Sequence, residues 1–147
     1  MISDFIIQNL PYDKPFLFVD QIIDVNEDYI KGTYTFNKDE FFYKGHFKDN
    51  PVTPGVILTE CMAQIGLAGM GIYMYKDKLE ELSGVAMTSN TIDYYKPVFP
   101  GEKVTVIADK EYFRFQKLKC NIAMYNEKDV LVAKGSISGM IAKFHAL

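Results

Sequence analysis

Residues 54–75 of this 147-residue chain read PGVILTECMAQIGLAGMGIYMY, and this stretch decides the fold class. Pro54 can open a helix, because the N–H that proline lacks would have no helical partner in the first turn. Glu60 is the only charged side chain between residues 56 and 75, so the helix should be enclosed by other structure. Gly66, Gly69 and Gly71 each lower the helix propensity by up to about 1 kcal/mol, which a closely packed sheet would offset.

Strands are predicted on both sides of this helix. After a short helical start, runs of β-branched and aromatic residues between turn signals cover residues 16–25, 29–36, 84–95, 103–115, 118–125 and 130–142. One long helix and six strands in the order ββ-α-ββββ indicate an α+β fold. No repeat or linker divides the chain, so we expect a single domain over residues 1–147. Its sheet should curve around the helix, because no second long helix is available to cover it.

The composition argues against several classes of protein. The net charge is −3 and Arg114 is the only arginine, so binding to nucleic acid has little electrostatic support. The N-terminal residues include neither a basic region nor a long apolar run, which favours a cytoplasmic protein over a secreted one. Glu60 and the small residues of the long helix favour a core helix over a membrane span. Cys61 and Cys120 lack metal-ligand spacing, and we interpret them as buried thiols.

The loop before the helix and the first turns of the helix hold the residues suited to chemistry. His46 and Glu60 lie 60 − 46 = 14 positions apart, and each has an ordinary alternative as a surface residue or a helix-dipole partner. Burial would raise the pKa of Glu60 and suit it to donate a proton near neutral pH. Gln64 shares a helix face with Glu60 and either orients it or is simply satisfied in the core. Gly55 either offers its backbone N–H to a thioester carbonyl or serves a turn.

Three segments together resemble one known family. Residues 45–64 read GHFKDNPVTPGVILTECMAQ, residues 10–22 read LPYDKPFLFVDQI, and residues 94–102 read YYKPVFPGE. The first is similar to the active-site segment of the 3-hydroxyacyl-[acyl-carrier-protein] dehydratases of type II fatty-acid synthesis, the FabZ class. The other two are similar to the flanking patterns of that family, so the resemblance extends over almost the whole chain.

The resemblance implies a hot-dog fold, in which an antiparallel sheet wraps around one long central helix. It implies a homodimer, or a trimer of dimers, in which the histidine of one subunit meets the carboxylate of its neighbour. His46 would then remove the α-proton of a (3R)-3-hydroxyacyl thioester, and Glu60, with water, would assist departure of the β-hydroxyl to leave a trans-2-enoyl product. Gly55 would bind the thioester carbonyl, and Gln64 would support Glu60. Neither a cofactor nor a metal is expected.

Departures from the family pattern suggest a divergent branch. Tyr12 stands where the family usually has His, and Lys48-Asp49 stand where it usually has Pro-Gly. The dehydratase–isomerase branch of the family has Asp where Glu60 stands, so isomerase activity is not expected. The pathway could make membrane fatty acids or a specialised polyene.

The expected partner is an acyl carrier protein, which is strongly acidic. Because this chain is itself net negative, docking would require a local basic patch. The candidate patch holds four basic side chains against Glu111 alone, a local charge of 4 − 1 = +3: Lys110, Arg114, Lys117 and Lys119. The ordinary alternative is that these basic residues belong to a solvated hairpin without a partner.

Two other functions remain open, a hot-dog acyl thioesterase and a non-catalytic acyl-binding subunit. The presence of both His46 and Glu60 argues for the dehydratase.

Overall fold

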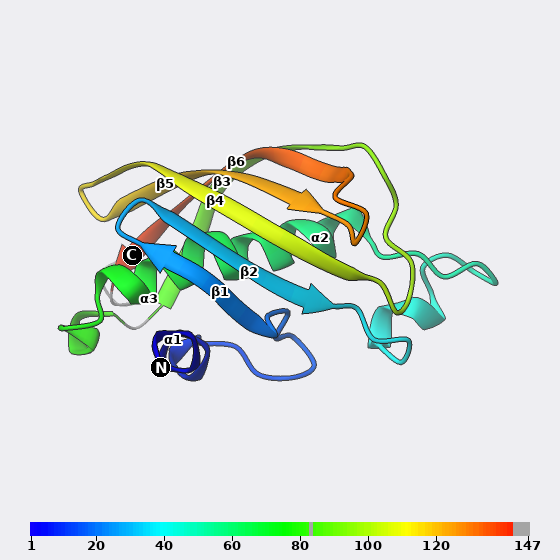
Figure 1. Ribbon diagram of the computed structural model, residues 1–147, viewed down its shortest axis with the longest axis horizontal. Coiled ribbons are helices and arrows are strands. Elements are labelled where there is room, and N and C mark those ends of the chain that lie inside the picture. Colours follow the sequence, from blue (N-terminus) through cyan, green and yellow to red (C-terminus); the bar gives the residue numbers. More distant parts are fainter. Residues whose placement is uncertain (83, 143–147) are drawn as a thin grey trace.

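The computed structural model describes residues 1–82 and 84–142, and its elements follow the predicted order (Figure 1). The N-terminal helix is α1 (Ile2–Asn9), and short 3-10 helices η1 (Phe41–Lys44) and η3 (Leu79–Glu81) lie in the connections. The central helix consists of α2 (Gly55–Met62), the π-helical η2 (Ala63–Ala68) and α3 (Gly69–Met74). The strands are β1 (Gln21–Asn26), β2 (Tyr29–Thr35), β3 (Gly84–Tyr94), β4 (Lys103–Arg114), β5 (Lys117–Tyr125) and β6 (Leu131–Ala142).

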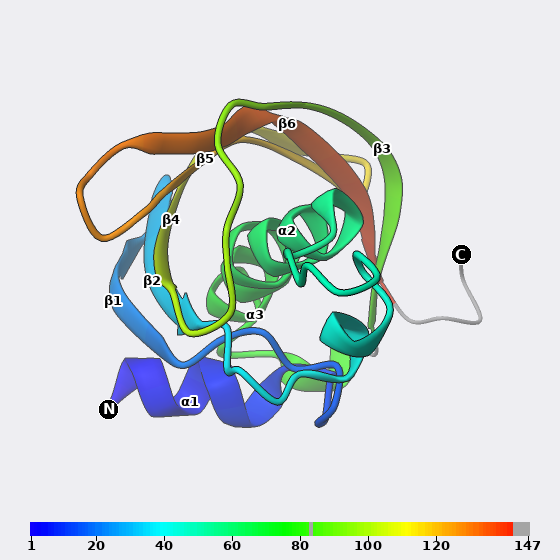
Figure 2. The same ribbon diagram turned by 90° about the vertical axis from the view of Figure 1, so that its right-hand side faces the viewer.

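The six strands form one antiparallel sheet in the order β1-β2-β4-β5-β6-β3. The sheet curves around the central helix, and α1 lies across the side that the sheet leaves open (Figure 2). This arrangement confirms the predicted α+β hot-dog architecture. It also leaves β1 and β3 as the two edge strands.

Buried and more exposed side chains alternate along the strands, and the buried ones form the core. In β5 the residues at 118, 120, 122 and 124 are buried and face the helix, whereas the residues between them are more exposed. The central helix has the length and hydropathy of a membrane span, but 83% of its most apolar window is buried inside the fold, as in the core helix of a soluble protein. The predicted close approach occurs at Gly66, where an added Cβ would lie 2.7 Å from Ile122 Cδ1 and 3.0 Å from Ala108 Cβ.

The first strand begins five residues later than predicted, at Gln21 instead of residue 16. The reason is a side chain of the central helix. Gln64 Oε1 accepts a hydrogen bond from the backbone N–H of Phe18 at 2.7 Å, and Gln64 Nε2 donates to the carbonyl of Phe16 at 2.9 Å. These backbone groups are therefore satisfied by an amide side chain rather than by a neighbouring strand.

Candidate active site

His46 lies in the loop that follows η1, and two hydrogen bonds to Val52 hold it. The backbone N–H of Val52 donates to the carbonyl of His46 at 2.8 Å, and His46 Nδ1 donates to the carbonyl of Val52 at 2.9 Å. Because a carbonyl oxygen can only accept, Nδ1 carries the proton in this contact. In the neutral ring Nε2 then has a free lone pair and can accept a proton. The sequence suggested His46 as a base, and the loop holds the tautomer that a base requires.

The cavity beside His46 has a volume of about 350 Å³ and includes Gly55, Leu58 and Tyr94 in its lining. Gly55 is the first residue of α2, where backbone N–H groups have no acceptor within the helix. A Cβ at this position would lie 3.3 Å from the Tyr94 ring, so glycine allows the ring to pack against the start of the helix. The Tyr94 hydroxyl is hydrogen-bonded to Thr59 Oγ1. The cavity thus combines a base, an open helix N-terminus and an aromatic wall.

Glu60 lies further along α2, and its carboxylate is half-buried. Gln64 Nε2 donates a hydrogen bond to Glu60 Oε2 at 3.0 Å, which agrees with the shared helix face inferred from the spacing of four. Burial raises the pKa of Glu60 above its usual value, and the hydrogen bond from Gln64 opposes this shift only in part. The protonated, acid form of Glu60 therefore persists to higher pH than that of an exposed glutamate.

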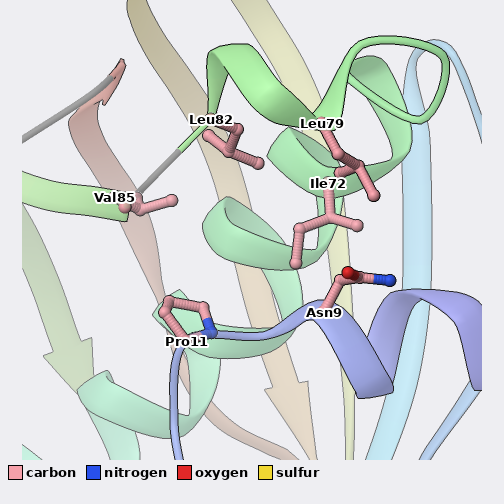
Figure 3. Close-up of a pocket in the computed structure, with 7 residues that line it drawn as sticks. Asn9, Pro11, Ile72, Leu79, Leu82 and Val85 are labelled. Carbon is pink, nitrogen blue, oxygen red and sulfur yellow. The ribbon is translucent and has the colours of Figure 1, made fainter.

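Glu60 does not share a cavity with His46 of the same chain. It lines a separate cavity of about 240 Å³ with Tyr12, Ala63, Leu67, Val85 and Met87. Val85 also lines a third cavity of about 100 Å³, which lies between the loop after α1, the end of the central helix and the start of β3 (Figure 3). The side chains of Ile72, Leu79 and Leu82 form the apolar part of its lining, and Asn9 adds a polar side chain.

The predicted basic patch is only partly available for docking. Lys110 Nζ lies 3.8 Å from Asp28 Oδ1, and Lys119 Nζ lies 3.3 Å from Glu111 Oε2. The Arg114 guanidinium lies over the Tyr112 ring, 4.1 Å from its centroid. In the part of the chain that the structure describes, neither Arg114 nor Lys117 has a carboxylate partner at salt-bridge distance.

Two tyrosines of the cavities had no role assigned from the sequence. Tyr94 belongs to the YYKP segment, which entered only as part of a family pattern. Tyr12 was noted as a departure from that pattern, although it lines the same cavity as Glu60. The proximity of Tyr12 to Glu60 and of Tyr94 to Gly55 has no signal in the sequence. The members of these pairs are 48 and 39 positions apart. Only the folded arrangement brings each pair together.

Comparisons with known proteins agree with the fold and with the family that the sequence resembles. Residues 10–134 match the model of the FabA-like domain. The chain is 33% identical over 138 residues to the 3-hydroxyacyl-[acyl-carrier-protein] dehydratase FabZ of Lactococcus lactis subsp. cremoris, covering 93% of this chain and 85% of the relative. It is 37% identical over 99 residues to FabZ of Thermoanaerobacter sp. strain X514, covering 66% and 67% of the two chains. The dehydratase heterocomplex ApeI:P from Xenorhabdus doucetiae has a similar fold, with a TM-score of 0.79, 14% identity and coverage of 95% and 90%.

Proposed function

The chain belongs to the FabA-like family and is a 3-hydroxyacyl-[acyl-carrier-protein] dehydratase of fatty-acid biosynthesis, and from this premise we propose that His46 and Glu60 form its catalytic pair across a dimer interface. The observation that supports the assignment of His46 is its hydrogen bond to the Val52 carbonyl, which leaves Nε2 free to accept a proton. The observation that supports a dimer is the separation of His46 and Glu60 into two cavities of one chain.

β3 is the strand through which the proposed dimer forms. It is an edge strand whose middle residues, 87–91, are all exposed, so its outer backbone groups are open to a further strand. A second copy of β3 paired antiparallel would join the two sheets about a two-fold axis.

The direction of β3 brings the two cavities together in such a dimer. β3 begins beside the Glu60 cavity, at Val85 and Met87, and ends beside the His46 cavity, at Tyr94. Antiparallel pairing reverses one copy, so the Tyr94 end of one subunit lies opposite the Val85 end of the other. His46 of the partner subunit would then approach Glu60.

The proposed reaction is a β-elimination in which the protons balance. His46 Nε2 removes the α-proton, the backbone N–H of Gly55 stabilises the negative charge that develops on the thioester oxygen, and the Cα–Cβ double bond forms. The bond between Cβ and the hydroxyl oxygen breaks, and Glu60 in its acid form supplies the proton that completes the departing water. His46 gains one proton and Glu60 loses one, and proton exchange with solvent returns both residues to their starting protonation states.

The acyl chain would lie along the central helix, beyond Glu60. The Glu60 cavity and the third cavity share Val85, and most of the side chains around both are apolar. We propose a (3R)-3-hydroxyacyl substrate and a trans-2-enoyl product, a homodimer or a trimer of dimers, and action in the cytoplasm.

A spectrophotometric assay tests this reaction. Wild-type protein given a 3-hydroxyacyl thioester on an acyl carrier protein should form the conjugated enoyl thioester, which absorbs in the ultraviolet, with no release of free thiol. Free thiol measured with a thiol reagent, in the absence of the enoyl signal, would instead identify a thioesterase. Binding without either product would identify a non-catalytic acyl-binding subunit.

The exposed side of the β4–β5 hairpin is the proposed docking site for the acidic carrier protein. Arg114 and Lys117 flank its tip, and the Phe115 ring between them is 88% exposed. The register aligns Leu118, Gly139 and Met87 across β5, β6 and β3, so the hairpin lies at the Glu60 end of β3. A carrier protein bound there would be close to the acyl cavity.

Charge reversal at the hairpin tests the docking site. Arg114→Glu combined with Lys117→Glu should raise KM for carrier-bound substrate about tenfold at low salt, because attraction of opposite charges becomes repulsion. Added salt should reduce the defect by screening these exposed charges. Turnover of a short thioester without the carrier should stay unchanged.

The matched control is Lys128→Glu combined with Lys134→Glu, which changes the net charge equally. Lys128 lies in the loop at the other end of β5, and both side chains are exposed. This control should leave KM for the carrier-bound substrate unchanged. Equal losses in the two double variants, or an equal loss with the carrier-free thioester, would dismiss the hairpin as the docking site.

A further inference from the structure

Tyr12 and Glu60 supply the hydrogen-bonding side chains of one otherwise apolar cavity. Six described residues line this cavity, and the other four are Ala63, Leu67, Val85 and Met87. A hydroxyl group that enters the cavity therefore has these two polar side chains available as partners. Because an unpaired polar group is costly in apolar surroundings, the substrate hydroxyl should bind where these two residues meet.

Tyr12 and Glu60 each have a hydrogen-bonding group that no other described residue uses. Gln64 occupies Oε2 of the Glu60 carboxylate, whereas Oε1 and the Tyr12 hydroxyl have no hydrogen-bond partner among residues 1–82 and 84–142. A tyrosine hydroxyl can donate one hydrogen bond and accept others. Both residues can therefore still bind a hydroxyl group that enters the cavity.

The segment that carries Tyr12 is anchored to the helix that carries Glu60. Gln64 binds the backbone of Phe16 and Phe18, and Cys61 Sγ donates to the Phe18 carbonyl at 3.4 Å. The same Gln64 amide binds Glu60. One buried glutamine thus ties together the position of the carboxylate and the backbone near Tyr12.

The protonation state of Tyr12 suits it to donate a hydrogen bond. Burial, with a further contribution from the negative charge of Glu60, raises the pKa of Tyr12 to about 12. The hydroxyl therefore keeps its proton throughout the neutral range.

We propose that the Tyr12 hydroxyl donates a hydrogen bond to the β-oxygen of the 3-hydroxyacyl substrate and holds this oxygen against Glu60 until it leaves as water. This role rests on the proposed function. It transfers no proton, since Glu60 supplies the proton of the departing water and Tyr12 remains neutral. It makes Tyr12 a further residue that recognises the hydroxylated substrate.

Tyr12→Phe removes the hydroxyl and keeps the ring. Because the lost hydrogen bond is to the oxygen whose bond to Cβ breaks in the transition state, kcat for dehydration should fall roughly 10- to 100-fold, and KM should rise only severalfold. Tyr29→Phe is the matched control, since it removes the hydroxyl of a half-buried tyrosine in β2 and should leave kcat unchanged.

A binding comparison separates recognition of the hydroxyl from a structural role. In the His46→Ala background, which prevents turnover, Tyr12→Phe should weaken binding of 3-hydroxyoctanoyl-pantetheine severalfold and leave binding of octanoyl-pantetheine unchanged. Equal weakening of both ligands, or no weakening of either, would overturn the role of Tyr12. If Tyr12→Phe does not fold, Tyr12→His replaces it and must keep the preference for the hydroxylated ligand, because imidazole also offers an N–H donor.

Failure of the Tyr12 proposal can be distinguished from failure of the proposed function. Failure of the proposed function appears in the unmodified protein, as absence of enoyl product, or in a His46→Ala variant that keeps its activity. An active wild type whose Tyr12→Phe variant has wild-type kcat and wild-type preference for the hydroxylated ligand would refute the Tyr12 proposal alone.

Discussion

His46→Ala and Glu60→Gln should each lower turnover of a 3-hydroxyacyl thioester by about two orders of magnitude or more, as loss of a positioned base or acid does. Alanine at 46 removes the Nε2 lone pair that accepts the α-proton, and the amide at 60 keeps the shape of the side chain but has no acidic proton. Initial rates of enoyl formation at saturating substrate measure the effect. Both variants should fold, because His46 and Glu60 are half-buried and neither change empties the core.

Glu80→Gln is the control for the change at position 60. Glu80 lies in η3 and is exposed, so this variant changes the net charge equally and should keep wild-type turnover. Thermal unfolding monitored by circular dichroism reports whether each variant is folded. Turnover near the wild-type level in a folded His46→Ala protein would refute the proposed mechanism.

Mixing the two inactive variants should restore activity to about a quarter of the wild-type level, the statistical value for random exchange in a symmetric dimer with two sites. Half of the dimers are then mixed, and each mixed dimer contains one site with both His46 and Glu60. The recovery relative to either variant alone should be at least about 25-fold, since each starts near one hundredth of wild type. The measurement is enoyl formation after subunit exchange has been verified by differential tagging.

A mixture of wild type with the His46→Ala/Glu60→Gln double variant provides the opposite test. If the two residues meet across subunits, a mixed dimer has no complete site, so exchange at equal amounts should halve the activity. If both residues act within one chain, exchange should leave the activity of this mixture unchanged. No recovery in the first mixture and no decrease in the second would together place the catalytic pair within a single chain.

The sequence by itself determined the architecture and supplied the candidate site residues. Residues 54–75 are apolar nearly all round, and such a helix has to be enclosed whatever the details of its surroundings. Alternating runs such as residues 118–125 predicted strands whose observed bounds differ by one residue or a few. The spacing of four also placed Gln64 beside Glu60 correctly, because that contact depends only on helix geometry.

The pairing of residues far apart in the chain was decided only by the tertiary structure. The late start of β1 depends on Gln64, whose side chain occupies backbone groups that local propensity assigns to a strand. Tyr12 and Glu60 line one cavity, and His46 lines another, because of the way the sheet wraps the helix. The physical reason is that periodicity and propensity describe each segment along its own axis. Contacts between segments depend instead on the curvature of the sheet and on close packing, which the whole chain determines together.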